Sequence, residues 1–463
     1  MFIQVVWSRA GHAFAAALAL FASSTLASTN TSETSLSNGL RVIVKEDSRA
    51  PVVVSMIWYR AGSMDEVNGK TGVAHVLEHM MFKGTKDYPA GEFNKLVALA
   101  GGRDNAFTNR DYTAYFQQVP KSELPLMFRL EADRMANLNL TDDEFAKEIK
   151  VVMEERRLRT DDKARALLYE QLLATAHIAH PYRTPVIGWM NDLENMRPED
   201  ARRWYRDWYA PNNATLVVVG DVKAPDIFKL AEKYFGAITS RPLPDRKPQD
   251  EPIQRGERRI TVKAPAELPY LVMAYHVPKI RDVEQDWEPY ALEVLDAILD
   301  GHEAARLTRS LVRESRVASS VGASYDSVAR GPTLFLLEGT PSHGKTVQDL
   351  ETALRQEVRK IAEQGVSQEE LGRVKAQVVA AEIFQRDSMF YQAMQIGALE
   401  TAGLPHQSLD LQIAKVKAVT ATQVQEVAKK YFQDDTLTVA VLEPQPLDAT
   451  KRVSQVNGPR HAD

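Results

Sequence analysis

The sequence contains no cysteine. This absence excludes disulfide bonds, a lipid-modified cysteine and a zinc site made of thiolates, so a bound metal would depend on histidine and carboxylate ligands. Neither sign of charge dominates, because the formal net charge of the 463 residues is only -5. A basic patch is the usual mark of nucleic-acid binding, and we therefore expect no nucleic-acid partner.

The apolar run near the N-terminus, residues 13–22, is too short to span a bilayer. Arg9 and His12 precede it, and a small-residue cleavage motif ends at Ala27. We expect a secretory signal peptide over residues 1–27 and no stable membrane anchor after its cleavage, with an uncleaved anchor as the alternative. A signal of bacterial type predicts a periplasmic or secreted protein.

The order of strand-like and helical patterns indicates two similar halves. We predict an α+β fold of two homologous halves, each a mixed or antiparallel sheet packed with helices. The matching strand-containing segments are 39–45, 52–58 and 208–219 in the first half and 259–263, 270–275 and 431–441 in the second.

Composition indicates where one half ends and the next begins. Residues 241–256 are rich in proline and charge, which predicts an exposed linker. It separates a metal-bearing N-terminal domain, 36–240, from a C-terminal domain, 257–446, and a flexible tail, 447–463, follows. Helical patterns occur at 92–100, 124–137, 142–176, 285–315, 345–363 and 367–396.

The apolar stretch from Thr71 to Phe82 contains the pattern His75-x-x-Glu78-His79. On a helix, histidines four residues apart lie on one face, where two neutral imidazoles can chelate one Zn²⁺. Glu78 can lie beside the open coordination position and take a proton from a bound water. For these five residues alone, a structural polar network on a buried helix is the alternative.

A third ligand is available 76 positions after His79, at Glu155. Glu148 precedes Glu155 by seven residues, so two turns of helix place both carboxylates on one face. A mononuclear catalytic zinc site needs three protein ligands and an open position for water. Because the second half contains no His-x-x-Glu-His pattern, we expect one zinc ion per chain.

This combination of motifs resembles the inverted-zincin metallopeptidases of the pitrilysin/insulinase type. The closest branch is the short one, which includes the mitochondrial processing peptidase subunits and bacterial two-chain peptidases, and the resemblance covers nearly the whole chain after the signal region. It implies that His75, His79 and Glu155 bind zinc. It also implies that Glu78 is the general base and that Glu148 orients a ligand histidine.

The resemblance further implies a binding edge for an extended substrate. Asn105, Ala106 and Phe107 would lie on an edge strand beside the zinc, and a peptide would add to it as a further strand held by backbone hydrogen bonds. A simple entry from a loop into a strand is the alternative for these residues.

In the resembled family, an arginine and a tyrosine from a second-half domain bind the substrate carbonyl and its developing oxyanion. Arg313 matches the arginine, but Ser319 stands where the tyrosine is expected, unless Tyr325 takes that role. The short branch includes pairs of chains, one with the metal motif and one with the Arg/Tyr motif. We therefore expect this chain to be the metal-bearing subunit of a heterodimer whose four domains close around a chamber.

The predicted function is that of a zinc-dependent endopeptidase that hydrolyses peptides or unfolded segments inside the chamber. The alternative is a non-catalytic peptide-binding or scaffold subunit of a peptidase-like complex. A structural zinc site fits less well, because such sites use four closed ligands that usually include cysteine. We do not expect His177-x-x-His180 to bind metal, since Pro181 ends its helix, and we expect a loop packed near the site.

Overall fold

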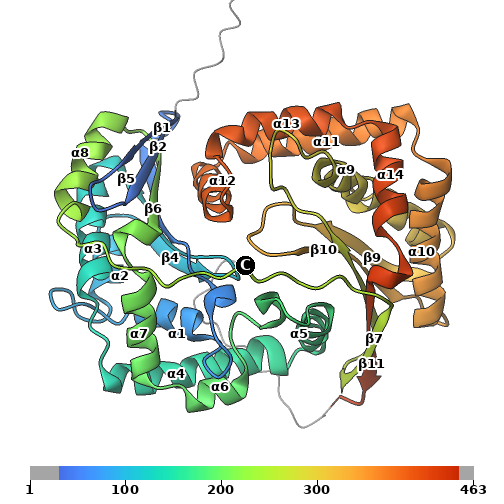
Figure 1. Ribbon diagram of the computed structural model, residues 1–463, viewed down its shortest axis with the longest axis horizontal. Coiled ribbons are helices and arrows are strands. Elements are labelled where there is room, and N and C mark those ends of the chain that lie inside the picture. The colour runs from blue at the N-terminus through green and yellow to red at the C-terminus, as the bar shows by residue number, and fades with distance from the viewer. Residues whose placement is uncertain (1–30, 448–463) are drawn as a thin grey trace, which may run out of the picture.

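The computed structural model describes residues 31–447 and contains two β-sheets covered by helices (Figure 1). The predicted α+β class with two sheet-and-helix halves is thereby confirmed. The expected signal peptide, 1–27, and all but the first residue of the expected tail, 447–463, lie outside the described residues.

Both sheets are mixed. β2 pairs with β6, and β7 with β11, in parallel, whereas the other pairs are antiparallel. The first sheet, in the order β1-β2-β6-β3-β5-β4, comprises β1 (Thr31–Ser35), β2 (Arg41–Glu46), β3 (Val52–Tyr59), β4 (Arg103–Thr108), β5 (Thr113–Pro120) and β6 (Ala214–Gly220). The second, in the order β7-β11-β8-β10-β9, comprises β7 (Arg258–Pro265), β8 (Tyr270–Val277), β9 (Ala318–Tyr325), β10 (Thr333–Pro341) and β11 (Leu437–Gln445).

The two sheets share one topology once β1 is set aside. When the strands are numbered along the chain within each half, both sheets have the order 1-5-2-4-3. An internal duplication would produce this match. β4 and β9 consequently occupy equivalent edge positions. β1 pairs with β2 at the other edge of the first sheet, and its residues precede residue 36, where we expected the N-terminal domain to begin.

Some of the helices begin after a residue whose side chain caps the first turn, as Thr141 does before α4 by accepting a hydrogen bond from the backbone of Glu144. The first half contains α1 (Val73–Met80), α2 (Glu92–Leu99), α3 (Leu124–Asn137), α4 (Asp142–Arg156), α5 (Ala164–Ala176), α6 (Met190–Asn195), α7 (Pro198–Trp208) and α8 (Ala224–Phe235). The second contains α9 (Glu288–Asp300), a π-helical turn (Thr308–Glu314), α10 (Val347–Gln364), α11 (Gln368–Gln385), α12 (Met389–Ala402), α13 (Leu409–Ala418) and α14 (Ala421–Tyr431).

Each sheet is covered in part by a helix from the other half. α5 packs against β7 and β11 of the second sheet, and α12 packs against β3 and β6 of the first (Figure 1). Met389, Ala393 and Ile396 of α12 share a buried cluster with Trp58 of β3. Gly397 permits this close approach, because a Cβ at that position would lie 1.9 Å from the Trp58 ring.

Three segments that the sequence pattern predicts as continuous helices are broken. Within 285–315, residues 301–305 separate α9 from the helical residues that end in the π-helical turn (Thr308–Glu314). The other two breaks precede helices that cover the opposite sheet. A π-helical turn (Arg157–Asp161) and residues 162–163 divide the predicted helix 142–176 into α4 and α5, and residues 386–388 divide 367–396 into α11 and α12. The helical periodicity of the sequence does not indicate which of the two sheets each helix will cover.

The linker contains no helix or strand, and most of its residues are exposed or half-buried. It is nevertheless held in place by hydrogen bonds at several positions, among them Arg246 and Glu251. Arg246 Nε donates to Asp65 Oδ1 at 3.1 Å. The Glu251 carboxylate accepts hydrogen bonds from the backbone of residues 178–180 at 2.8–3.0 Å.

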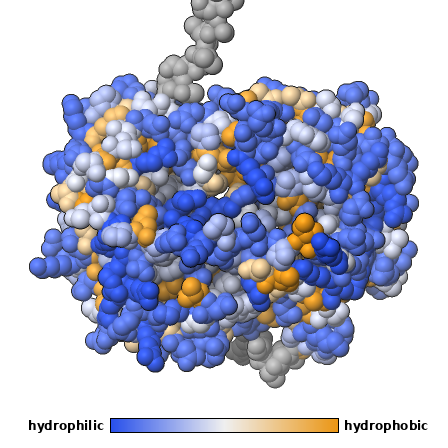
Figure 2. Space-filling model, viewed as in Figure 1, coloured by the Kyte–Doolittle hydropathy of each residue, from blue (hydrophilic) through white to orange (hydrophobic). Residues whose placement is uncertain are grey.

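On the face shown in Figure 2, hydrophilic residues predominate and hydrophobic residues form small, scattered groups. Within residues 31–447, no helix combines the length and the apolar composition needed to cross a membrane.

Candidate metal centre

Helix α1 places the predicted motif between the first core and α4. Its apolar side chains belong to that core, whereas His75, Glu78 and His79 face α4 and β4. The helix begins after Gly72, which has a φ of 87°. A Cβ on Gly72 would lie 2.5 Å from the carbonyl oxygen of Ile187, so the start of α1 requires glycine at this position.

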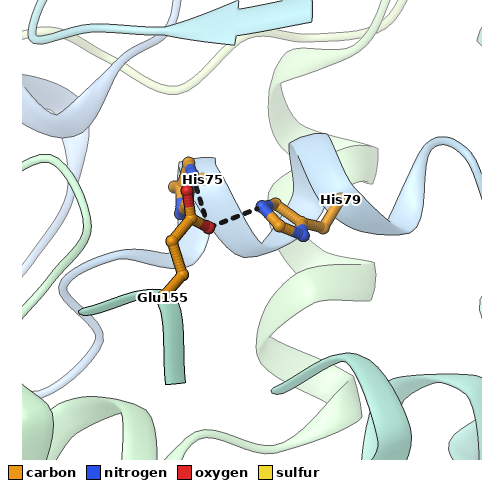
Figure 3. Close-up of side chains that lie close together, drawn as sticks. All are labelled: His75, His79 and Glu155. Carbon is orange, nitrogen blue, oxygen red and sulfur yellow. Dashed lines mark ion pairs between the residues drawn. The ribbon is translucent and has the colours of Figure 1, made fainter. Parts of the chain in front are cut away.

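The three predicted ligands converge (Figure 3). Glu155 lies in the last turn of α4, and its Oε2 is 3.2 Å from His79 Nε2 and 3.8 Å from His75 Nε2. One ligand atom of each residue lies within 4.8 Å of the others. In the part of the chain that the structure describes, this is the one group of three such residues that could hold a metal ion.

The geometry and the donor set fit a zinc ion. Two ligand atoms that are each about 2 Å from a tetrahedral ion lie about 3.4 Å apart. This value falls between the distances from Glu155 Oε2 to His79 Nε2 and to His75 Nε2. Two imidazole nitrogens and one carboxylate oxygen, with a fourth position open, are the ligands of a catalytic rather than a structural site. His75, His79 and Glu155 would therefore hold the ion.

Glu148 fixes the orientation of His79. Its Oε1 accepts a hydrogen bond from His79 Nδ1 at 2.9 Å, so Nε2 is the ring nitrogen whose lone pair could bind a metal ion. Lys83 Nζ lies 2.5 Å from the other oxygen, Glu148 Oε2. Although burial raises the pKa of Glu148, the hydrogen bonds from His79 and Lys83 lower it below its ordinary value.

The charges at the centre favour a cation between His79 and Glu155. Burial lowers the pKa of His79, but hydrogen bonds to Glu148 and Glu155 outweigh it and raise this pKa to about 9. Burial raises the pKa of Glu155, yet the hydrogen bond from His79 and the proximity of His75 bring it down to about 2. A divalent cation supplies the positive charge that these carboxylates stabilise.

Glu78 is buried beside the three predicted ligands and is 3% exposed. Burial raises the pKa of its carboxyl group to about 7. Thr108, the last residue of β4, donates its hydroxyl proton to Glu78 Oε2 at 2.5 Å. A carboxyl group with a pKa near neutrality can accept a proton and return it, as a general base requires.

The predicted substrate residues lie on β4, which forms an edge of the first sheet. Asn105, Ala106 and Phe107 occupy the middle of this strand. Ala106 is buried in the same core as α1, whereas the Phe107 ring packs on the other face of the sheet against Trp58 and Tyr112. The Phe107 side chain therefore supports the packing beneath α12, and an added peptide would meet the backbone of β4.

The residues that were considered as binding groups for the substrate oxyanion lie in the second half. Arg313 is exposed at the end of its π-helical turn, and its ion pair is with Glu303 at 3.8 Å. Ser319 Oγ donates to a backbone carbonyl of β10, and the Tyr325 hydroxyl donates to the carbonyl of Pro278 at 2.6 Å. Among the described residues, no recorded hydrogen bond or ion pair joins any of these three to the metal motif.

Lys83, Thr108 and Arg159 also belong to the site, although the sequence motifs did not identify them. Arg159 Nε lies 3.0 Å from Glu155 Oε1. Lys83 and Arg159 each follow a predicted site residue, His79 or Glu155, by four positions, so helical spacing could have indicated both. Strand alternation could have indicated that Thr108 faces α1, but not that it reaches Glu78.

His177 and His180 lie in a loop that packs between the two halves. His177 is 1% exposed, and its ring contacts those of His180 and His276, the latter on β8. Burial lowers the pKa of His177 to about 3 and that of His180 to about 4. Both imidazoles are therefore neutral at neutral pH.

Two family profiles match adjacent parts of the chain. Residues 41–188 match "Insulinase (Peptidase family M16)", and residues 195–378 match "Peptidase M16 inactive domain". Together the two profiles cover most of the described residues. The first contains the whole metal motif, including Glu155.

Similar proteins include bacterial zinc proteases. Zinc protease PqqE of Helicobacter pylori is 32% identical over 423 residues, which cover 88% of this chain and 92% of PqqE. The uncharacterized zinc protease YmxG of Bacillus subtilis is 25% identical over 411 residues, which cover 88% of this chain and 97% of YmxG. The crystal structure of a protease from Helicobacter pylori superposes with a TM-score of 0.85 at 30% identity, covering 89% of this chain and 99% of that one.

Proposed function

Because the chain belongs to the insulinase family of peptidases, peptidase family M16, we propose that it is a zinc-dependent endopeptidase acting on peptides or unfolded segments. The observation that carries the proposal is the convergence of His75, His79 and Glu155 beside the buried carboxyl group of Glu78. The names of the similar zinc proteases agree with this proposal.

Each polar residue of the centre has a role in this proposal. A bound zinc ion supplies Lewis-acid chemistry, which polarises a peptide carbonyl and acidifies a water molecule. Glu78 accepts a proton from the attacking water and returns it to the leaving amine. Glu148 holds His79 in the tautomer that can bind metal, and Arg159 holds the second oxygen of Glu155.

The substrate in this proposal binds along β4. An edge strand offers backbone N–H and C=O groups to an extended peptide, and such pairing depends little on the peptide's side chains. Asn105, Ala106 and Phe107 would bind the peptide through these groups. Most extended segments of a folded protein are already paired within its own sheets, which favours peptides and unfolded segments as substrates.

The assembly we propose is a heterodimer with a homologous chain that carries the Arg/Tyr motif, its four domains closing around a chamber. Two observations support a second chain as the source of the tyrosine. Ser319 is too short to replace a tyrosine, and the Tyr325 hydroxyl donates a hydrogen bond to a backbone carbonyl. The Escherichia coli periplasmic protease PqqL has this fold in its first half, with a TM-score of 0.75 at 20% identity. The chain covers 52% of full-length PqqL, which thus has the length of two such units.

The test is hydrolysis of a quenched fluorescent peptide by the chain alone, by an Arg/Tyr-bearing homologue from the same genome, and by their mixture, with zinc quantified in each. We expect hydrolysis in the mixture and one zinc ion per copy of this chain. Full activity of a zinc-loaded monomer, with its mass checked by light scattering, would contradict the heterodimer but support the peptidase. Bound zinc without hydrolysis in any sample would favour a peptide-binding or scaffold subunit.

We also propose a periplasmic or secreted location, on the basis of the signal-like residues 1–27. The N-terminal sequence of the protein purified from its native cells should then begin after Ala27. An N-terminus that retains residues 1–27 would contradict cleavage.

A further inference from the structure

The turn between β4 and β5, residues 109–112, is held by the second half of the molecule. Arg330, in the loop between β9 and β10, donates its backbone N–H to Asp111 Oδ2 and its Nη1 to the Asp111 carbonyl, both at 2.8 Å. The same guanidinium forms a two-point ion pair with Asp65 at 2.7 and 3.0 Å. The side chains of Arg330 and Asp65 are each 5% exposed, and buried two-point pairs of this kind fix geometry strongly.

Further hydrogen bonds restrict the same turn. Asn109 Oδ1 accepts from the backbone N–H groups of Asp111 and Tyr112 at 2.7 and 2.9 Å. The Tyr182 hydroxyl donates to Asp111 and accepts from the Gly331 N–H, next to Arg330. The turn and the loop of the second half are therefore joined at several atoms, in addition to the hydrogen bonds that the backbone N–H groups of Ser63 and Met64 donate to the carbonyls of residues 109 and 110.

Thr108 directly precedes this turn and contacts the proposed general base. Its hydroxyl group donates to Glu78 Oε2 at 2.5 Å. Thr113, opposite Thr108 in the β4–β5 pairing, donates its own hydroxyl proton to the Ala61 carbonyl at 3.0 Å. The hydrogen bond from Thr108 restricts rotation of the Glu78 carboxylate, and its direction depends on where the turn holds Thr108.

We propose that Arg330 is a positioning residue for the general base, an inference that rests on the proposed peptidase function. By holding the turn at Asp111, Arg330 places Thr108, and the Thr108 hydroxyl orients the carboxylate of Glu78 for proton transfer. The half without the metal motif thus contributes to the geometry of catalysis. A purely structural role, in which Arg330 only joins the two halves, is the alternative that the test must exclude.

Thr108→Val removes the hydroxyl group at nearly constant shape, and Thr108→Ser keeps it. We expect Thr108→Val to lower kcat by about 10- to 100-fold, the size of effect that a misplaced catalytic group produces. KM should change less than about twofold, because the lost contact is with Glu78 and not with the substrate. Thr108→Ser should restore most of kcat, and all variants should retain stoichiometric zinc.

Arg330→Ala should lower kcat by a similar factor, and Arg330→Lys, which keeps the charge but loses the two-point geometry, supplies the test if the alanine variant does not fold. If Arg330 acts through Thr108, the double variant with Thr108→Val should be no slower than the slower single variant. Amide hydrogen exchange in residues 109–112 should accelerate in Arg330→Lys, which reports on the turn without reference to activity.

Arg246→Ala is the matched control. Arg246 also pairs with Asp65, at 3.1 Å, but makes no recorded contact with residues 109–112. We expect this variant to keep the kcat of the wild type and normal exchange in the turn. An equal loss of kcat in Arg246→Ala, or multiplicative losses in the Thr108→Val/Arg330→Ala double variant, would overturn the positioning role.

The two proposals can fail separately. Wild-type kcat in both Thr108→Val and Arg330→Lys, measured in a preparation that hydrolyses peptide, would overturn the role of Arg330 and leave the peptidase intact. Absence of hydrolysis by the wild-type protein in every preparation would overturn both.

Discussion

Glu148 shows how a side chain that would not touch the metal can control the centre. Its carboxylate accepts a hydrogen bond from His79 and pairs with Lys83, so it fixes the tautomer and the orientation of a proposed ligand. Arg159 acts on Glu155 in the same way from the following turn. The proposed ligands are thus held by charged neighbours before any metal binds.

Replacing Glu148 should weaken zinc binding without abolishing it. Glu148→Gln keeps an acceptor near His79 but loses the charge, and we expect zinc affinity to fall by about 10- to 100-fold, the usual effect of losing such an outer partner. Competition with a chromophoric chelator measures the affinity. Glu154→Gln, an exposed position on the same helix, is the control and should bind zinc as the wild type does. Unchanged affinity in Glu148→Gln would contradict the orienting role.

His177 predicts a loss of stability in acid. Its folded-state pKa of about 3 lies below its ordinary value, so between about pH 6.5 and 4 the unfolded chain binds a proton that the folded chain excludes. The stabilisation is therefore present above pH 6.5 and is lost as the pH falls. For one such group we expect a loss of about 2 kcal/mol between pH 6.5 and 4.5.

The measurement is the urea midpoint of unfolding at several pH values for the wild type and for His177→Phe, which keeps a buried ring but cannot titrate. The variant should lose less stability between pH 6.5 and 4.5 than the wild type. His343→Gln, at an exposed position, should follow the wild type. Parallel pH profiles for wild type and His177→Phe would show that His177 is not excluded from protonation.

For single residues, the sequence predicts which side chains lie together when they are close neighbours along the chain. His75, Glu78 and His79 lie within two turns of one helix, so their spacing alone predicts a shared face. Thr108 reaches Glu78 only because the sheet brings β4 beside α1, and no spacing along the chain contains that contact. The positions of Arg313 and Ser319 likewise depend on how the second half packs.

At the scale of elements, α5 and α12 decide how the halves join. The strands predicted at 39–45, 52–58, 259–263 and 270–275 follow from β-branched runs and turn signals, and capping residues mark the starts of helices such as α4 and α10. The strands β1, β9 and β10 were not predicted. The breaks after α4 and α11 were not predicted, because the segments on either side remain helical in pattern. After each break, the following helix packs on the apolar face of the opposite sheet, whose residues are far away in the sequence.

Gly397 tests the docking of α12 on the first sheet. A Cβ at this position would meet the Trp58 ring at 1.9 Å, so Gly397→Ala should destabilise the protein by about 1–3 kcal/mol through overpacking. Gly372→Ala is the matched control on α11, because nothing lies within 4 Å of its Cβ position. That change should be neutral or should stabilise by up to about 1 kcal/mol, since alanine favours helix.

Thermal unfolding followed by calorimetry measures both changes. The expected pattern is a lower unfolding temperature for Gly397→Ala and an equal or higher one for Gly372→Ala. If both variants behaved alike, the contact between α12 and Trp58 would not limit the packing of the halves.

At the scale of the whole molecule, two units of one topology exchange helices and share a buried polar contact around Arg330 and Asp65. The repeated plan was predictable from the matching strand segments. The exchange and the contact were not, because both are interactions between the halves. They bring the second half into contact with the turn beside the proposed metal centre, although the metal motif lies wholly in the first half.

The most direct test of the central claim compares wild type and Glu78→Gln in a preparation that hydrolyses peptide, with zinc content and kcat measured on the same samples. Zinc should stay stoichiometric in the variant, and its kcat should be lower by about 10²- to 10⁴-fold, the usual loss on removing a general base. Loss of zinc from Glu78→Gln would make Glu78 a ligand, and an unchanged kcat would remove it from the reaction. Either result would contradict the centre described here.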